Sequence, residues 1–409
     1  MNSKNAQTTG GIHDKGGHSA RTSYINAVNR RALVSTSHNP HAHDDDDESS
    51  RICRKGTTHP RGAAPPADPR GHRRRSKDGK KAPSAVNPLV PSVSAIRNKP
   101  HPIGTDLHIL KGDVATCATG RILGHEGTGV VHSVGASVTT FKPGDRVIVS
   151  CITSCMSCEF CRKGLASHCV DGGWILGHTI DGTQAEYVRV PHADGSLHHL
   201  ISGASEAAQA MCSDVLPTGF ECGVLSGRVK PGSSVAIVGG GPIGLGIVLT
   251  AQLYSPSSLI MITRDANRLK IAASLGATHC ITFGPNAAEE VMALTGGRGV
   301  DTVIEAAGVP GTFDLCQDLV AVGGTIANLG VHGCKVDLHL DKLWHKNIAI
   351  TTSLVDTVST GMLLKLLSSG KIKTDALVTH TFSFAEMLDA YSTFGAAAEH
   401  KAIKVIIDF

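Results

Sequence analysis

The amino-acid sequence predicts an α/β protein in which a doubly wound parallel sheet follows a smaller, mostly β unit. The first observation is the apolar run at residues 235–238, which leads directly into a glycine-rich turn. The second is the alternation of short apolar runs with helical segments beyond that turn. The third is the preceding segment, where short strands at 128–134 and 146–151 are separated by turn signals such as those at 142–145.

The glycine-rich turn contains Gly239, Gly241 and Gly244 at G-x-G-x-x-G spacing, and a helix is expected over residues 243–253. Between a strand and a helix, the first glycine permits the tight turn and the second lets a pyrophosphate approach the backbone. The third lets the helix pack closely against the strand, and the helix N-terminus offers free N–H groups to the phosphates. We therefore expect a Rossmann domain that binds a dinucleotide.

The segment 231–263 carries no charged residue, so hydropathy alone is also compatible with a membrane span. The glycine cluster and the Ser-Pro-Ser-Ser break at 255–258 favour buried strands around a buried helix instead. Further strands are expected at 259–262, 302–304, 324–329 and 402–409, and helices at 267–275, 287–294, 313–320 and 362–368.

The net charge of +4 hides a division between the first hundred residues and the rest. Residues 1–100 have a balance of +10 and residues 101–409 a balance of −6. The basic segment holds one aromatic residue, Tyr24, and no periodic apolar pattern. We therefore expect a disordered tail over 1–100. We expect no signal peptide, because no apolar segment of the required kind follows the N-terminus. We expect no nucleic-acid partner, because the basic and histidine-rich runs of such a tail are usually solvated.

Four cysteines, Cys155, Cys158, Cys161 and Cys169, have the spacing C-x₂-C-x₂-C-x₇-C. Four thiolates without an imidazole or a carboxylate make a closed tetrahedral site, so the zinc predicted here is structural. A cluster of this kind favours a reducing compartment, the cytoplasm, over disulfide formation. The nearby Cys151 is interpreted as a small buried apolar side chain.

A second constellation combines a G-H-E segment at 124–126 with an M-C-S-D segment at 211–214. With these residues the chain resembles the zinc-dependent medium-chain alcohol dehydrogenases over about residues 104–409. The matching segments are G-T-D-L-H (104–108), G-R-I-L-G-H-E-G (120–127), F-K-P-G-D-R-V (141–147), the four-cysteine loop, D-G-T-Q-A-E-Y (181–187), S-D-V-L-P-T-G-F-E (213–221) and the glycine-rich turn. The resemblance implies a GroES-like catalytic domain over 101–212, a Rossmann domain over 213–358 and a return to the catalytic domain over 359–409.

The resemblance also implies roles for single residues. His125 and Asp214 correspond to two ligands of the catalytic zinc, in the branch of the family that uses aspartate. Glu126 corresponds to a neighbour that can approach the metal. Thr105 and His108 correspond to the hydroxyl and imidazole that pass the alcohol proton to solvent. The metal is expected to act as a Lewis acid that favours the alkoxide.

One position departs from the family pattern. The first zinc ligand of the family is a cysteine immediately before G-T-D, and this chain has Ile103 there. The opening strands of the family are also expected to be missing, and we hypothesise that an altered exon replaced them. Because two protein ligands are fewer than the three that a catalytic zinc normally keeps, we predict weak catalytic zinc occupancy and low turnover.

The residues after the second strand of the Rossmann domain favour NADP over NAD. Thr263 occupies the position where an NAD enzyme places an acidic residue, and Arg264 and Arg268 follow it. A hydroxyl and two guanidinium groups suit a 2′-phosphate. Asp265 is the counter-argument, because a shift of two residues would favour NAD. The resemblance adds Thr218 to the expected cofactor-binding residues.

The sequence therefore predicts an oxidoreductase that transfers hydride between NAD(P) and a small primary or secondary alcohol, or its aldehyde or ketone. The alternative is a catalytically inactive dinucleotide-binding relative that keeps only the structural zinc. A zinc-free reductase is a third hypothesis, which the cysteine loop, His125 and Asp214 disfavour. We expect no membrane association. The resemblance implies a homodimer or a homotetramer.

Overall fold

The computed structural model describes residues 94–100 and 104–408. Most of the predicted tail, residues 1–93, lies outside the described residues, as does Ile103. The expected end of the tail at residue 100 is wrong, because Ser94–Pro100 forms strand β1. Ile96 in this strand is fully buried, so it adds apolar surface to a core instead of joining a solvated segment.

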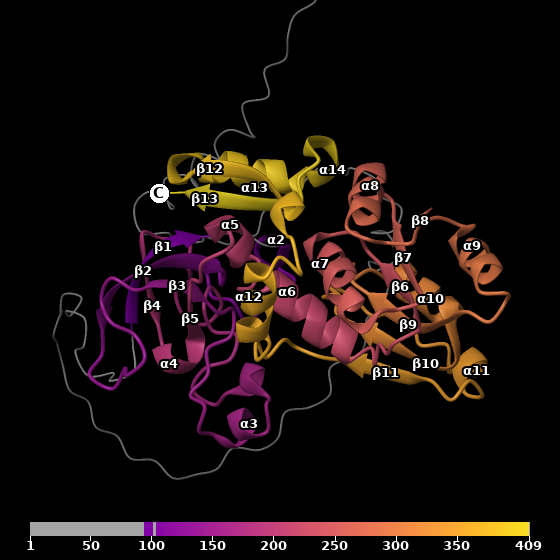
Figure 1. Cartoon of the computed structure of the whole chain (residues 1–409), viewed down its shortest axis with the longest axis horizontal. Coiled ribbons are helices and arrows are strands. Elements are labelled where there is room, and N and C mark those ends of the chain that lie inside the picture. The colour runs from indigo at the N-terminus through magenta and orange to yellow at the C-terminus, as the bar shows by residue number, and fades with distance from the viewer. Residues whose placement is uncertain (1–93, 101–103, 409) are drawn as a thin grey trace, which may run out of the picture.

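β1 belongs to an antiparallel five-stranded sheet with the order β4-β1-β2-β3-β5. The other strands are β2 (Gly127–Val134), β3 (Arg146–Val149), β4 (Tyr187–Val190) and β5 (Leu197–His199). Buried side chains from all five strands share one core cluster with Phe141 and Leu176. This sheet lies on the indigo-to-magenta side of the molecule in Figure 1.

Within the described residues, seven helical segments lie between β1 and the second sheet, and α2, α3 and η4 among them carry residues of the candidate sites. They are α2 (Gly104–Lys111), α3 (Glu159–Arg162), η3 (Ala166–His168), α4 (Ala193–Ser196), α5 (Glu206–Ala210), α6 (Val215–Pro217) and the π-helix η4 (Thr218–Leu225). The sequence pattern did not predict α2, because its only buried residue is the polar Asp106. A helix without a buried apolar stripe gives no periodic signal.

The second sheet has six parallel strands in the order β11-β10-β9-β6-β7-β8. The strands are β6 (Ser234–Val238), β7 (Ser258–Thr263), β8 (His279–Thr282), β9 (Val300–Glu305), β10 (Val320–Asn328) and β11 (Ala349–Thr352). The helices between them are α7 (Pro242–Ala251), η5 (Gln252–Tyr254), α8 (Ala266–Ser274), α9 (Ala287–Leu294), α10 (Pro310–Leu319) and α11 (Leu340–Leu343). The doubly wound sheet that the sequence predicts is present.

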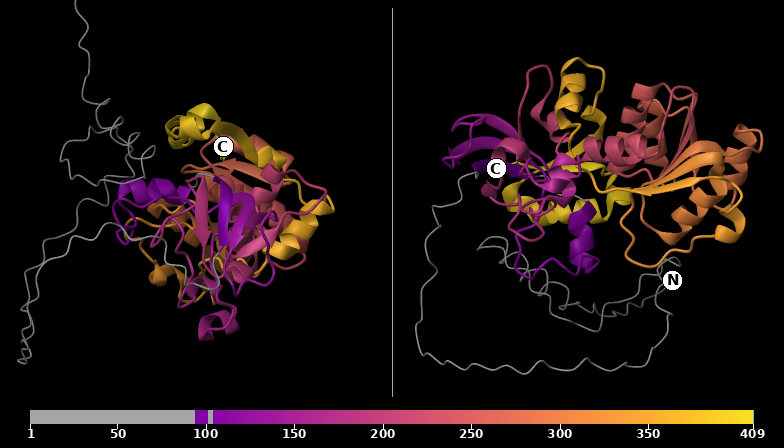
Figure 2. Two further views of the ribbon diagram at one scale, coloured as in Figure 1. Left: turned by 90° about the vertical axis from the view of Figure 1, so that its left-hand side faces the viewer. Right: turned by 90° about the horizontal axis from the view of Figure 1, so that it is seen from below.

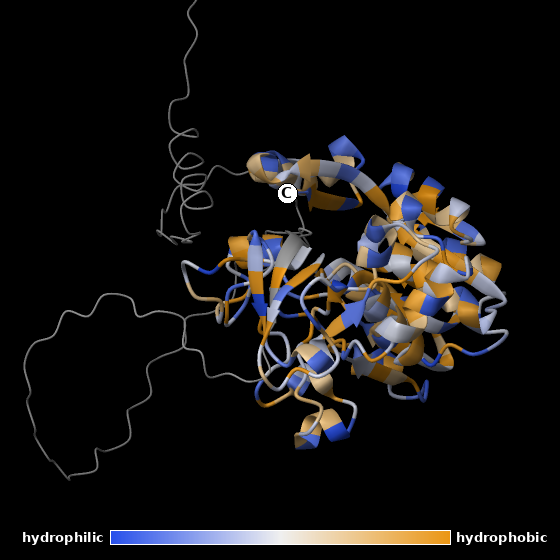
Figure 3. Cartoon of the chain, turned by 60° about the vertical axis from the view of Figure 1, so that its left-hand side comes forward, coloured by the Kyte–Doolittle hydropathy of each residue, from blue (hydrophilic) through white to orange (hydrophobic). Residues whose placement is uncertain are grey.

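Both faces of this sheet are buried, which explains the uninterrupted apolar run in β6. Val235 and Ile237 point into a core shared with α7, whereas Ala236 and Val238 point into a second core shared with α9 and α10. Figure 2 shows helices on both sides of the sheet, and these helices carry hydrophilic as well as hydrophobic residues (Figure 3). Strands whose successive side chains alternate between two buried faces are typical of parallel sheets.

The strand order reverses direction between β6 and β9, which are neighbours. In open α/β sheets this switch point opens a crevice at the carboxyl ends of the two strands. The turn after β6 contains Gly239 and the segment after β9 begins at Ala306. The fold therefore places the glycine-rich turn at the edge of a ligand crevice.

The chain beyond β11 returns to the first sheet (Figure 1). It forms α12 (Thr360–Ser368), η6 (Asp375–Leu377), β12 (Val378–Ser383), η7 (Phe384–Glu386), α13 (Met387–Gly395), α14 (Ala397–His400) and β13 (Lys404–Asp408). In β13, the Lys404 ammonium is 2.7 and 2.8 Å from the two carboxylate oxygens of Glu126. In α13, the Tyr391 hydroxyl donates to Gln184, and the Gln184 amide donates to Asp106 on α2.

None of the helices within residues 94–100 and 104–408 is long and apolar enough to cross a membrane. The uncharged segment 231–263, whose hydropathy is also compatible with a membrane span, is divided between β6, α7, η5 and β7.

The ion pair between Glu126 and Lys404 generates a prediction about stability. Both residues are at most 1% exposed, and removing one partner of a buried pair leaves the other charge uncompensated. We expect Lys404→Met to lower the free energy of unfolding by about 3–5 kcal/mol, measured by urea denaturation. The matched control is the exposed Lys371→Met, and the double variant Lys404→Met/Glu126→Gln should recover much of the loss. Equal effects of the two lysine variants would contradict this prediction.

Candidate functional site

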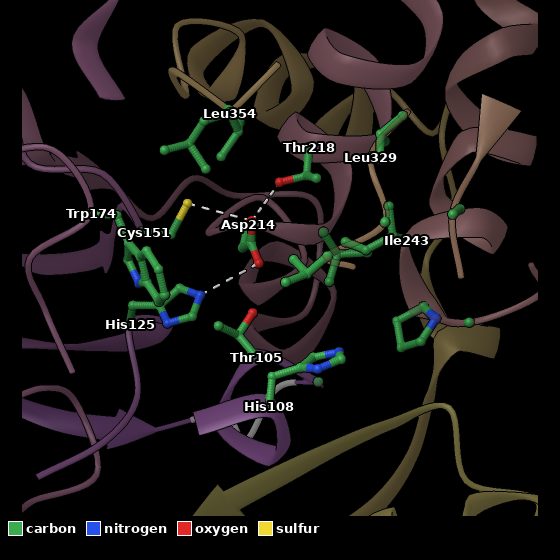
Figure 4. Close-up of a pocket in the computed structure, with 18 of the residues that line it drawn as sticks. Thr105, His108, His125, Cys151, Trp174, Asp214, Thr218, Ile243, Leu329 and Leu354 are labelled. Carbon is green, nitrogen blue, oxygen red and sulfur yellow. Dashed lines mark hydrogen bonds and ion pairs between the residues drawn. The ribbon is translucent and has the colours of Figure 1, made fainter. Parts of the chain in front are cut away.

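The G-H-E segment is held in place by a glycine that no other residue can replace without strain. Gly124 has φ +90°, and a Cβ atom on it would lie 2.6 Å from the Thr183 hydroxyl oxygen. The Thr183 N–H donates to the Gly124 carbonyl at 2.8 Å. The segment that contains Thr183 therefore fixes the backbone immediately before His125, whose side chain faces a cavity between the two sheets (Figure 4).

Asp214 is the shared partner of three side chains in this cavity (Figure 4). Its Oδ2 atom lies 3.8 Å from the His125 Nε2 atom. Its Oδ1 atom accepts a hydrogen bond from the Thr218 hydroxyl at 2.5 Å and one from the Cys151 thiol at 3.5 Å. Thr218 begins the π-helix η4, so one carboxylate joins the loop from the first domain to the start of the second.

The charges of His125 and Asp214 support each other. Burial alone lowers the pKa of His125, but the neighbouring Asp214 carboxylate raises it above its ordinary value. Burial alone raises the pKa of Asp214, but His125 and the Thr218 hydroxyl bring it below its ordinary value. The 3.8 Å separation is too long for a direct hydrogen bond, so we attribute the effect of His125 and Asp214 on each other's pKa to the charge of the partner at short range.

The cavity has a volume of about 300 Å³ and connects this trio to the glycine-rich turn. Its wall is mostly apolar and includes Trp174, Ile152 and Leu354. The Trp174 ring meets His125 edge-on, with ring centroids 5.8 Å apart. A small, mostly apolar cavity with a few convergent polar groups is the usual form of a small-molecule site.

Thr105 and His108 line the cavity from helix α2. Residues three apart lie on the same helix face, and the Thr105 hydroxyl points toward Asp214 in Figure 4. The Nδ1 atom of His108 lies 2.7 Å from Asp113 Oδ2. With Nδ1 bound to Asp113, Nε2 is the ring atom left for a partner in the cavity.

Glu126 does not line this cavity. Its carboxylate is fully buried and held by Lys404, which does line the cavity. Burial raises the pKa of Glu126 to about 7, against the opposing effect of Lys404. The structure therefore brings Thr105, His108, His125 and Asp214 together, while Glu126 lies behind them with a cation of its own.

The donor set around Asp214 has the chemistry that a zinc ion requires. An imidazole nitrogen, a carboxylate and a thiol are all zinc ligands, and the three groups are buried on one cavity. Their donor atoms lie farther apart than the sulfur atoms of the four-cysteine cluster. Within the part of the chain that the structure describes, only that cluster brings at least three donor atoms to within 4.8 Å of one another.

The four-cysteine cluster, Cys155, Cys158, Cys161 and Cys169, forms around α3 and η3. Backbone N–H groups donate to the sulfurs: Cys155 N–H to Cys169 and Cys158 N–H to Cys155, both at 3.3 Å. Burial would raise the pKa of Cys155, but hydrogen bonds from Ser157 and the backbone lower it to about 6. Four converging sulfurs with such donors fit a closed tetrahedral zinc site.

The glycine-rich turn has the geometry expected of a dinucleotide site. Gly239 has φ +114°, and a Cβ atom on Gly244 would lie 1.9 Å from the Gly239 carbonyl oxygen. A Cβ atom on Gly241 would meet nothing within 4 Å. Gly241 caps the N-terminus of α7 and lines the cavity, so the open space lies where a phosphate would approach.

The residues expected to choose between NADP and NAD are arranged around the end of β7. A Cβ atom on Gly240 would lie 3.1 Å from the Thr263 hydroxyl oxygen, so Thr263 abuts the glycine-rich turn. Arg264 is exposed. Asp265 caps helix α8 by accepting from the N–H groups of Asn267 and Arg268.

The side chain of Arg268 has partners within the protein. Its Nε atom lies 3.7 Å from Asp265 Oδ2, and its Nη2 atom donates to the Ala402 carbonyl at 3.3 Å. The interpretation of Arg268 as a solvated helix residue therefore does not apply, since its side chain is 21% exposed. Neither Arg268 nor Thr263 lines the cavity, but Thr263 lies against the glycine-rich turn.

Sequence reasoning missed four residues of this site: Cys151, Asp113, Trp174 and Lys404. Cys151 was interpreted as a buried apolar side chain, and it is 2% exposed, but its thiol faces Asp214. Lys404 offered one signal, a lysine inside an apolar terminal strand, because a buried lysine is almost always paired. Asp113 and Trp174 carried no comparable signal.

The four-cysteine cluster generates a prediction about metal content. Cys158→Ser should remove one tightly bound zinc per chain and lower the unfolding midpoint by at least about 5 °C, because a structural zinc contributes directly to folding. Zinc counting and thermal unfolding measure the two effects. The exposed Cys280→Ser is the matched control, and a Cys158→Ser protein that keeps its zinc and its midpoint would contradict the assignment.

Comparison with known proteins gives the family. The model of the alcohol dehydrogenase GroES-like domain matches residues 102–200, and the model of zinc-binding dehydrogenases matches residues 242–368. An alcohol dehydrogenase of Cupriavidus necator is 35% identical over 71% of this chain and 85% of its own length. The NADP-dependent isopropanol dehydrogenase of Thermoanaerobacter brockii is 31% identical over 69% of this chain and 82% of its own.

The solved structures agree with this result. Zinc-dependent alcohol dehydrogenase 2 from Streptococcus pneumonia, in its apo form, is 52% identical and superposes with a TM-score of 0.75. The match covers 80% of this chain and 92% of that one. The resemblance, the GroES-like and Rossmann architecture and the enzyme class that the sequence indicated are confirmed. The chain belongs to the family of zinc-dependent alcohol dehydrogenases.

Proposed function

We propose that this enzyme transfers hydride between a small primary or secondary alcohol, or its aldehyde or ketone, and NADP. The observation that carries the proposal is the single cavity lined by His125, Asp214 and the glycine-rich turn. A metal ligand set and a dinucleotide turn on one cavity allow an alcohol carbon to approach a nicotinamide. The apolar wall favours substrates with few hydroxyl groups, because extra hydroxyls would lose their hydrogen bonds with water.

In the proposed mechanism, His125 and Asp214 would hold the catalytic zinc. When bound, the zinc supplies Lewis-acid stabilisation of the alcohol oxygen and the nicotinamide accepts hydride. The Thr105 hydroxyl accepts the hydrogen bond of the alcohol and relays the proton to Nε2 of His108. Asp113 holds Nδ1 of His108 and so fixes the ring. Trp174 and Leu354 exclude water from the cavity.

The choice of NADP rests on the charges at the end of β7. Thr263 places no carboxylate beside the turn, and Arg264 supplies a cation next to it. The acid that argued for NAD, Asp265, is occupied as the N-cap of α8. The relative from Thermoanaerobacter brockii, named as NADP-dependent, adds support.

We also propose that the catalytic centre is weakened, because Ile103 cannot ligate a metal. The alternative function, a dinucleotide-binding relative without catalysis, follows if the weakened site holds no zinc at all. Introducing a cysteine at position 103 distinguishes the weakened enzyme from the dinucleotide-binding relative without catalysis.

We further propose a homodimer or homotetramer in the cytoplasm. β11 is the outer strand of the six-stranded sheet, so one of its edges has no neighbouring strand in the described part of the chain. Leu340 and Trp344, which precede it, are 59% and 77% exposed. Such an edge favours pairing with another chain, and sedimentation equilibrium that finds a monomer would contradict it. The reduced state needed by four zinc-binding thiols supports the cytoplasm.

The departure at position 103 generates a prediction about activity. Ile103→Cys should raise the occupancy of the second zinc and raise kcat at least about tenfold, since an added thiolate ligand strengthens a weakly held metal. Zinc counting and steady-state kinetics with NADP and a short secondary alcohol measure the effects. Val114→Cys, which adds a thiol elsewhere on the same cavity, is the control. If both variants behave like the parent chain, position 103 does not limit this enzyme.

The end of β7 generates a prediction about the cofactor. Thr263→Asp should lower the preference for NADPH over NADH at least about tenfold, because like charges about 4 Å apart repel by about 1–4 kcal/mol. Fluorescence titration with both cofactors measures the ratio. Ser257→Asp, an exposed position just before the opposite end of β7, is the control. Tighter NADH than NADPH binding by the parent chain would contradict the choice of NADP.

A further inference from the structure

We propose that Cys151 is the third protein ligand of the catalytic metal, in place of the cysteine that this chain lacks at position 103. The inference rests on the proposed function and deepens it by completing the donor set. Cys151 is not one of the four structural cysteines. It follows β3 and lies on the wall of the cavity, where its thiol and the His125 imidazole flank Asp214 (Figure 4).

The distances suit a shared metal. With zinc–ligand bonds of about 2.0–2.3 Å, two ligand atoms of a tetrahedral site lie about 3.4–3.6 Å apart. The Cys151 sulfur lies 3.5 Å from Asp214 Oδ1, and His125 Nε2 lies 3.8 Å from Asp214 Oδ2. The sulfur distance falls within this range, and the nitrogen distance, which is measured to the other carboxylate oxygen, is slightly longer.

Other polar groups near the trio are less suited to be the third ligand. The Glu126 carboxylate is held by Lys404 through both oxygens. The His108 side chain is 32% exposed and therefore less enclosed than the trio, and Thr218 offers only a neutral hydroxyl that already donates to Asp214. Cys151 alone among these residues offers a soft donor that becomes an anion on binding zinc.

The trio is shielded from water. Cys151, His125 and Asp214 are 2%, 5% and 7% exposed, so water would compete little with these donor atoms for a bound metal ion. The trio is looser than the four-cysteine cluster, which alone meets the 4.8 Å limit among the described residues. We therefore expect two classes of site, a tight one at the cluster and a weaker one at Asp214.

The test is a titration of the metal-free full chain with Co²⁺ under reducing conditions. The first equivalent fills the four-cysteine cluster. If Cys151 is a ligand, the second equivalent adds a further thiolate-to-cobalt charge-transfer band, because a sulfur also binds the second ion. This band should vanish in Cys151→Ser and Cys151→Ala, and the affinity for the second ion should fall at least about tenfold.

Cys316→Ala is the matched control, because Cys316 is fully buried in helix α10 and does not line the cavity. It should keep the second band and the second affinity. In Ile103→Cys/Cys151→Ala the second band should return, since a thiolate is then supplied from the other position. This double variant also shows whether loss of the band in Cys151→Ala reflects a missing ligand or a misfolded chain.

A second ion that binds without a thiolate band overturns the proposal, as does unchanged second-site affinity in Cys151→Ala or the absence of any second site. The proposed function fails separately. If Cys151→Ala keeps its turnover and its metal content, the proposed dehydrogenase activity is supported and Cys151 is not a metal ligand. If neither the parent chain nor Ile103→Cys shows turnover, the proposed dehydrogenase function is wrong, and the cobalt spectra do not change that conclusion.

Discussion

The arrangement of the active site depends on the carboxylate of Asp214. It lies between the two domains, with His125 on one oxygen and Cys151 and Thr218 on the other. Thr218 opens a π-helix that leads to the first strand of the parallel sheet, and single π-helical turns often mark functional sites. A buried anion needs compensation, and the neighbouring His125 supplies part of it in this cavity.

The fold could be predicted from the sequence where the signal is local. The run 235–238 is apolar at every position because β6 is buried on both faces, and the glycines that follow it have steric requirements that the structure reproduces. The four structural cysteines were equally readable, because one short loop supplies every ligand. Strand β8 was not predicted, because three of its four residues are exposed and the sequence therefore contains no apolar run at that place.

The candidate site was predictable only in part, because its remaining contacts join distant segments. Lys404 reaches Glu126 across 278 positions and Tyr391 reaches Gln184 across 207. The side chain of Cys151 shows the limit most clearly. Burial made the apolar interpretation reasonable, yet the residue it faces, Asp214, lies 63 positions away. Family resemblance implied two metal ligands and one missing ligand, and only the three-dimensional arrangement pointed to the thiol that we propose in its place.

The most direct test of this account is a crystal structure of the full chain with zinc and NADPH, with anomalous diffraction collected at the zinc edge. The account predicts two anomalous peaks for each chain, a strong one within the four-cysteine cluster and a weaker one in contact with His125, Asp214 and the Cys151 sulfur. A single peak at the cluster, or a second peak that Cys151 does not contact, would contradict it.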